Sequence, residues 1–111
     1  MRLWHWQLID VLPRQLLLGQ WRECCLIERN IQRIGYPNHI LVNPVSQYDR
    51  RGFYGYCLFV ANEMAARRIN VNLDALSESN RWHDVVKYHQ CMPPFFVGWH
   101  TENYLKQCYY N

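Results

Sequence analysis

The adjacent side chains of Arg22 and Glu23 are the pair in this 111-residue chain whose types best suit chemistry. A carboxylate beside a guanidinium acts as a general acid or base, or it stabilises a cationic intermediate electrostatically. The same pair is more often a plain surface ion pair, which contributes little to stability. The pair therefore marks a candidate catalytic carboxylate and leaves the structural alternative open.

Histidine and cysteine become frequent toward the C-terminus and raise the question of a metal site. The candidate ligands are His83, His89, Cys91, His100 and Cys108. Their spacings match no closed zinc pattern, and the one tight pair, His89 and Cys91, is a weak signal. We therefore expect no metal.

Nucleotide cofactors and cysteine nucleophiles are also disfavoured. The five scattered glycines fit neither dinucleotide-binding nor P-loop spacing. Cys24 and Cys25 fall on the apolar side of a predicted helix, where thiols are inert. Five cysteines are an odd number and the chain has no secretion signal, so we expect free thiols and no disulfide framework. From the glycine spacing we expect no cofactor.

Arginine dominates the positive charge. Ten of the twelve basic residues are Arg, and the formal net charge is +3. Residues 1–68 hold nine of these arginines, so the front half is basic and the back half is slightly acidic. Guanidinium groups bind phosphate through a rigid fork of donors, which suits a nucleic-acid partner as well as it suits a solvated surface.

The element that must position Arg22 and Glu23 is a helix predicted over residues 12–34. Pro13 fits its first turn with Asp10 as its candidate cap, and Gly35 ends it. One stripe, apolar except for Glu28, is formed by Leu17, Trp21, Cys24, Cys25, Glu28 and Ile31. Spacings of seven and four residues place Arg22, Arg29 and Arg33 together on the opposite stripe.

A second helix is predicted from its cap, Asp49, to about Ile69. Its inner face is formed by Phe53, Cys57, Val60 and Met64. Arg67 and Arg68 are expected to meet the negative end of its dipole.

The remaining segments are predicted to be mostly irregular. Residues 36–48 form a loop whose run at 39–42 resembles a strand without a partner, residues 73–88 form a short helix or turn, and residues 91–99 are non-helical. Thr101 caps a last helix. The predicted fold is mainly α: a compact single domain over residues 1–111, with three to four helices joined by long loops.

No apolar run approaches the roughly 18 residues of a membrane helix, and the N-terminus has no signal-peptide pattern. We therefore expect a cytoplasmic protein that does not enter a membrane. The sequence does not determine its oligomeric state.

Two blocks near the N-terminus, residues 1–5 (MRLWH) and 12–25 (LPRQLLLGQWRECC), resemble the pyrimidine-dimer DNA glycosylase family of the phage endonuclease V type. The chain is most similar to the short bacterial branch of that family. The similarity extends to residues 63–68 (EMAARR) and 102–108 (ENYLKQC), although the front block carries the specificity. The resemblance implies a compact helical domain that acts on double-stranded DNA.

The resemblance also implies a mechanism. In this family the N-terminal α-amine attacks the sugar C1′ of a damaged nucleotide, forms a Schiff base and cuts the strand by β-elimination. Here that amine belongs to Met1, which we expect to be retained because Arg2 follows it. An α-amine has an ordinary pKa of about 7.7–8.0, so part of it is neutral at pH 7. The glutamate and arginine of the family fall on Glu23 and Arg22, and its phosphate-holding arginine falls on Arg2.

The DNA-binding surface is expected to be rich in arginine. The candidate contacts are Arg2, Arg14, Arg22, Arg29, Arg33 and His5. Trp4 and Trp6 are candidates for stacking on bases, whereas Trp21 belongs to the apolar stripe. For His5, an ordinary surface histidine is the alternative.

Two other functions remain open at this point. One is a non-catalytic nucleic-acid-binding protein with the same fold, which would bind DNA in a salt-sensitive way without covalent trapping. The other is a small interaction or assembly protein whose arginines serve a protein partner.

Overall fold

The chain is helical over most of the residues that the computed structural model describes, which are 2–37, 39, 41–73, 76 and 93–110. These residues form three α-helices, α1 (Arg14–Ile34), α2 (Arg50–Ala66) and α3 (Glu102–Tyr110). Two short 3-10 helices, η1 (Trp6–Val11) and η2 (Asn43–Gln47), precede α1 and α2. The described residues contain no strand, so the predicted mainly α fold is confirmed.

Most of the predicted segment 73–88 lies outside the described residues. The same holds for the candidate ligands His83, His89 and Cys91.

Helix α1 begins and ends for local reasons. Its first turn follows Pro13, and the expected cap is wrong: Asp10 lies inside η1 with an exposed side chain, and no side chain caps α1. Gly35 ends the helix as predicted, at φ 88°, and donates its N–H to the carbonyl of Ile31 at 3.0 Å. A left-handed residue at this position is most easily a glycine.

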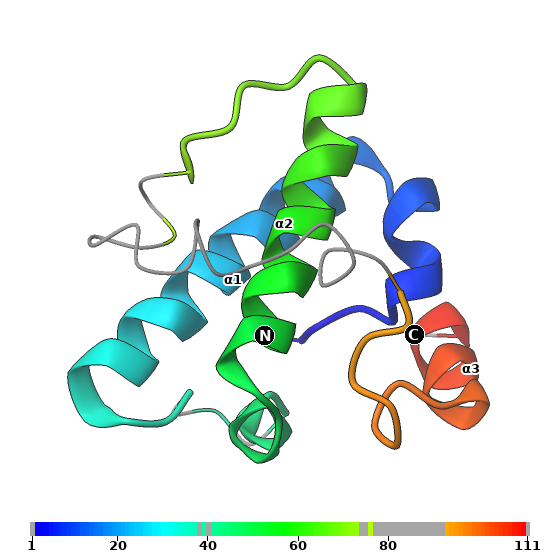
Figure 1. Ribbon diagram of the computed structural model, residues 1–111. Coiled ribbons are helices and arrows are strands. Elements are labelled where there is room, and N and C mark those ends of the chain that lie inside the picture. The colour runs from blue at the N-terminus through cyan, green and yellow to red at the C-terminus, as the bar shows by residue number, and fades with distance from the viewer. Residues whose placement is uncertain (1, 38, 40, 74–75, 77–92, 111) are drawn as a thin grey trace.

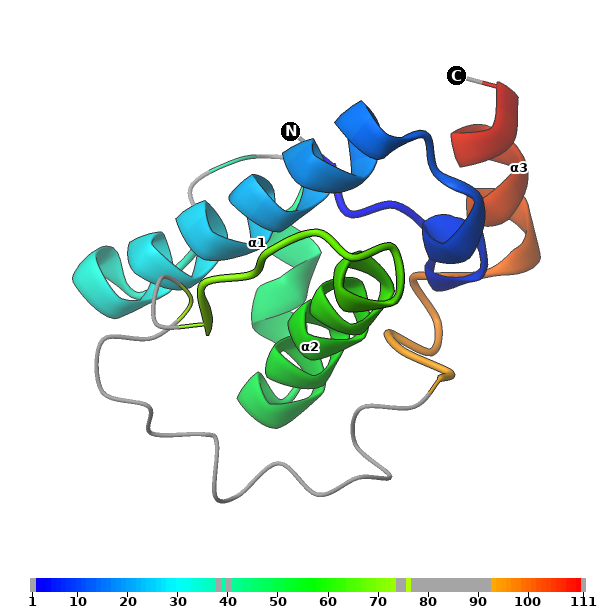
Figure 2. The same ribbon diagram turned by 90° about the horizontal axis from the view of Figure 1, so that it is seen from above.

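Helix α2 crosses α1, and the core lies between them (Figures 1 and 2). Asp49 caps α2 by accepting the N–H of Arg51 at 2.7 Å, as predicted. The predicted inner face is confirmed, because Phe53, Cys57, Val60 and Met64 are all buried. The helix ends at Ala66 rather than Ile69, because Arg68 adopts φ 61° and the Ile69 N–H turns back to the carbonyl of Met64 at 2.9 Å.

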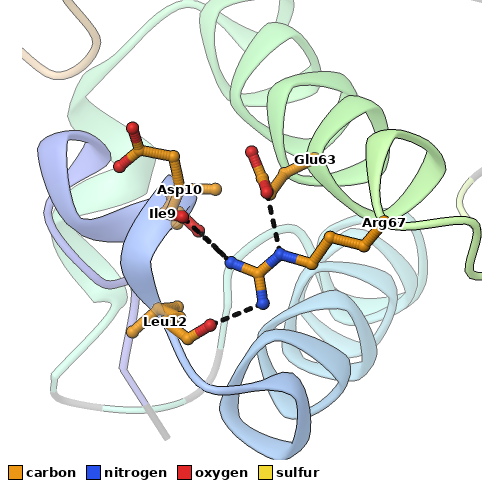
Figure 3. Close-up of polar contacts among 5 residues, drawn as sticks. All are labelled: Ile9, Asp10, Leu12, Glu63 and Arg67. Atoms are coloured by element: carbon orange, nitrogen blue, oxygen red, sulfur yellow. Dashed lines mark hydrogen bonds and ion pairs between the residues drawn. The ribbon is translucent and has the colours of Figure 1, made fainter.

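Arg67 joins α2 to the front of the chain (Figure 3). The guanidinium donates to the carbonyls of Leu12 at 2.6 Å and Asp10 at 3.1 Å, with a longer contact of 3.4 Å to Ile9. Glu63 holds it from the other side at 2.8 Å. The Arg67 side chain thus satisfies carbonyls at the end of η1, which that short helix leaves without internal partners. The expected interaction of Arg67 with the dipole of α2 stays a prediction.

The segments after α1 and before α3 are irregular, as predicted. Leu41 and Val42 lie in a turn that leads into η2, so the strand-like run forms no strand in its described part. Residues 93–99 are non-helical. Thr101 then caps α3, because its Oγ1 accepts the Tyr104 N–H at 3.2 Å.

Candidate active site

A cavity of about 240 Å³, open to solvent, lies between the start of the chain and α1. It is lined by Arg2, Trp4, Gln15, Leu16, Gly19, Gln20 and Glu23. Two of the residues that the sequence analysis selected for catalysis and phosphate binding, Arg2 and Glu23, therefore meet in one place.

The periodicity of α1 explains why these residues share the cavity. Gln15, Gly19 and Glu23 follow one another at intervals of four residues, so they lie on successive turns of one flank. This flank runs between the buried stripe and the exposed stripe of Arg22. Gly19 has no atom within 4 Å of the place where a Cβ would be, so the middle of the flank is open.

The carboxylate of Glu23 is only partly satisfied. Its Oε2 atom is buried and has no hydrogen-bond partner among the described residues. The ion pairs in the described part of the chain do not include one between Glu23 and Arg22, so the plain ion-pair interpretation is not supported. A buried acceptor without a partner costs free energy, and such groups concentrate at sites that bind a ligand or do chemistry.

Residues 2–5, which we call the N-terminal arm, are held in place by side chains from all three α-helices. Gln20 of α1 accepts the Trp4 N–H at 2.8 Å and donates to the Arg2 carbonyl at 3.1 Å. Tyr56 of α2 donates to the Trp4 carbonyl at 2.5 Å. Tyr104 of α3 donates to the Leu3 carbonyl at 2.7 Å. Figures 1 and 2 show the arm as the dark blue segment that leads into η1 beside α3.

His5 continues this anchoring. Its Nδ1 accepts the Gln7 N–H at 3.1 Å, which leaves Nε2 protonated to donate to the His100 carbonyl at 3.1 Å. Burial lowers the pKa of His5. The side chain is 3% exposed, so the surface location considered for His5 is wrong, and the position favours an anchoring role over direct contact with phosphate.

His100 completes the anchoring from the C-terminal side. Its ring stacks on that of His5 with centroids 5.2 Å apart, and its Nδ1 accepts the Trp6 N–H at 3.3 Å. Burial, and secondarily the neighbouring His5, lowers the pKa of His100 to about 3. Both imidazoles are therefore neutral at pH 7, as these hydrogen bonds require.

The arginines selected for DNA binding lie outside the cavity, with one exception. Arg14, Arg22, Arg29 and Arg33 are exposed along α1. Arg2 is the exception: it is half-buried, and its guanidinium carbon lies 5.3 Å from the centroid of the Trp4 ring. A cation at that distance is attracted by the aromatic face.

The three tryptophans of this region differ in burial. Trp21 is buried in the core, as predicted. Trp4 and Trp6 are partly buried and pack against the core from outside. Base stacking by these two side chains stays a prediction.

The thiols of Cys24 and Cys25 are poorly suited to act as nucleophiles. Cys24 is buried, and burial raises the pKa of Cys25 to about 11. The thiol therefore stays protonated at neutral pH. Within the described part of the chain, no cluster of three His, Cys, Asp or Glu side chains could hold a metal ion, and no helix is long and apolar enough to cross a membrane.

Sequence reasoning missed the three side chains that anchor the arm. For Gln20 a signal existed: it follows Leu17 by three residues and precedes Cys24 by four, which places an amide on the buried stripe of α1. A buried amide needs partners from elsewhere in the chain. For Tyr56 and Tyr104 no such signal existed, since tyrosine is common in cores.

The family comparison covers all of the residues that line the cavity. A model of the family described as pyrimidine dimer DNA glycosylase matches residues 1–77, which include the N-terminal arm, α1 and α2. No curated protein sequence and no solved structure matches the chain. The match extends over more than half of the chain and agrees with the resemblance of its front block. The chain belongs to the pyrimidine dimer DNA glycosylase family.

Proposed function

We propose that this protein is a DNA glycosylase with AP-lyase activity that acts through the α-amine of Met1 on damaged double-stranded DNA. The observation that carries the proposal is the unpaired, buried Oε2 of Glu23 in a cavity shared with Arg2. Met1 is covalently bonded to Arg2, which is one of the residues that line that cavity. A carboxylate without a protein partner is suited to a cation that forms during the reaction.

The steps follow from the chemistry of an amine and an acetal carbon. The neutral amine donates its electron pair to C1′, and the bond from C1′ to the base breaks with its electrons leaving on the base, which takes up a proton. Opening of the sugar gives a protonated Schiff base. Removal of a C2′ proton then expels the 3′ phosphate by β-elimination. Glu23 stabilises the cationic intermediate and transfers protons, with Arg22 beside it in the chain, and Arg2 holds a phosphate close to the amine.

The exposed arginines of α1 are assigned to the DNA backbone. Arg14, Arg22, Arg29 and Arg33 present guanidinium groups along one helix, and such groups neutralise phosphates and release counterions. His5 serves this surface indirectly, by holding the arm from which Arg2 projects. We place the activity in the cytoplasm, where the thiols stay reduced.

Borohydride trapping on duplex DNA with a single abasic site tests the proposal. The protein must carry its native N-terminus, because a tag would block the amine. We expect a covalent adduct that maps to Met1 and disappears when the amine is acetylated. Glu23→Gln should slow the strand cleavage that follows adduct formation. Glu102→Gln is its matched control, since Glu102 is exposed on α3, away from the cavity. Salt-dependent DNA binding without an adduct would overturn the enzymatic proposal and leave a binding protein on this fold.

A further inference from the structure

The N-terminal arm meets α1 through one side chain that is almost completely buried. Gln20 is 1% exposed, and its amide engages the backbone of Arg2 and Trp4 on both sides of Leu3. Tyr56 and Tyr104 also hold the arm, but they come from α2 and α3 and do not line the cavity. Gln20 is therefore the anchoring side chain that also belongs to the candidate active site.

Gln20 precedes Glu23 by three residues, so the two side chains lie on neighbouring turns of α1, and both line the cavity. We infer that Gln20 is a positioning residue that sets the distance between the N-terminal α-amine and the carboxylate of Glu23. The inference rests on the proposed function, in which that amine is the nucleophile. By fixing the Arg2 carbonyl and the Trp4 N–H, the amide fixes the point from which residue 1 extends.

The role requires an amide at position 20. One end of the side chain must accept a hydrogen bond and the other must donate one. Methionine has a similar length but leaves both backbone groups without partners. Glutamate keeps the acceptor for Trp4, but it faces the Arg2 carbonyl with a second acceptor and adds a negative charge one turn from Glu23.

Trapping kinetics on abasic DNA provide the first test. We expect Gln20→Met to slow trapping about 10- to 100-fold, because a misplacement of about 1 Å has an effect of that size on an oriented reaction. Gln107→Met makes the same change at an exposed position of α3 and should trap at the wild-type rate. Arg67→Met destabilises the fold away from the cavity, and its folded form should also keep the wild-type rate. A wild-type rate in folded Gln20→Met would overturn the inference.

A second test needs no DNA. Competitive acetylation of the α-amine with acetic anhydride across a pH series, followed by peptide mass spectrometry, measures the pKa of the amine. If Gln20 holds the amine toward the carboxylate, Glu23→Gln should lower this pKa in the wild-type background and change it less in the Gln20→Met background. Equal shifts in both backgrounds would overturn the inference.

The two experiments distinguish failure of the proposed function from failure of the inference about Gln20. If the wild-type protein forms no adduct, the proposed function fails, while acetylation still decides whether Gln20 positions the amine. Where Gln20→Met does not fold, Gln20→Glu replaces it, with slower trapping expected and a wild-type rate contradicting the inference.

Discussion

Helix α1 carries two glutamates five residues apart whose surroundings differ completely. Glu28 is 1% exposed and its Oε1 accepts hydrogen bonds from Arg50 of α2 and from Gln32 at 3.1 Å. Glu23 borders an open cavity, and its buried Oε2 has no partner among the described residues. One carboxylate thus has two protein donors, whereas the buried oxygen of the other has none in the part of the chain that the structure describes.

The difference follows from the pitch of the helix. Five residues rotate a side chain by more than one full turn, so Glu28 faces α2 while Glu23 faces the N-terminal arm. Removing one partner of a buried ion pair is costly because the other charge stays buried without compensation, whereas a carboxylate oxygen with no protein partner remains free to act on a ligand. The comparison therefore separates a structural glutamate from a functional one on the same helix.

The largest expected effect is on catalysis at Glu23. Glu23→Gln should slow strand cleavage about 100-fold or more, because it removes the charge that stabilises the cationic intermediate. The free energy of unfolding should change by less than about 1 kcal/mol, because no described partner is lost. Single-turnover cleavage of abasic DNA and urea unfolding measure the two quantities. A large loss of stability with unchanged cleavage would reverse the roles of the two glutamates.

Glu28 should give the opposite result. Glu28→Gln should lower the free energy of unfolding by about 2–3 kcal/mol, below the usual cost of breaking a buried ion pair because Arg50 is 34% exposed and rehydrates. Cleavage by the folded protein should stay within about twofold of wild type, because Glu28 does not line the cavity. Urea unfolding and cleavage well below the melting temperature test this. Loss of cleavage in the folded variant would break the comparison.

Acidification should weaken the anchoring of the arm that faces Glu23, through His100. His100, whose pKa is lowered to about 3 against an unfolded value of 6.5, binds fewer protons folded than unfolded. Its contribution to stability is complete above pH 6.5 and is lost as the pH falls toward 3. The titratable rings packed against it are those of His5, Tyr56 and Tyr104, and the carboxylate of Glu102 lines the same cavity as His100 and His5.

The expected loss from His100 is about 2 kcal/mol between pH 7 and pH 5, at about 1.4 kcal/mol per pH unit below 6.5. Urea unfolding at the two pH values measures it. In His100→Gln this dependence should become clearly shallower. An equally steep dependence in the variant would assign the effect to other groups.

The smallest expected effect concerns the exposed stripe of α1. Arg29→Gln and Arg33→Gln should each reduce the slope of log affinity against log salt concentration by about one, with little change in trapping at saturating DNA. Fluorescence anisotropy at several salt concentrations measures the slope. Arg51→Gln is the control, because Asp49 pairs with that exposed arginine at 3.0 Å. An unchanged slope in both stripe variants would remove the stripe from the DNA interface.

Local signals in the sequence predicted the helices well. Gly35, Asp49 and Thr101 end or cap helices as their types and positions indicate, because a cap depends on residues within one turn of it. Asp10 does not cap α1 because it lies inside η1, which ends at Val11, whereas α1 begins at Arg14 after Pro13. Helical periodicity also identified the flank on which Glu23 lies, but the arm that faces this flank could not be predicted from it.

The long-range contacts could not be predicted, because they depend on where separate elements come together. Arg67 lies at the end of a helix, and only the packing of η1 against α2 gives its guanidinium three carbonyls to bind. His5 near the start of the chain suggests a surface residue, and only the return of the chain at His100 buries it.

The sequence by itself determined the helical class, since this depends on residue type and on spacing within each helix. It also determined the resemblance of the front block to a known family, which marked Glu23 and Arg2 as candidates. Only the tertiary structure decided that the buried Oε2 of Glu23 has no partner among the described residues and that Gln20 anchors the arm. The physical reason is that a hydrogen bond such as the one from Tyr104 to Leu3 joins residues 101 positions apart. Its existence depends on the packing of the whole chain, and no local pattern records it.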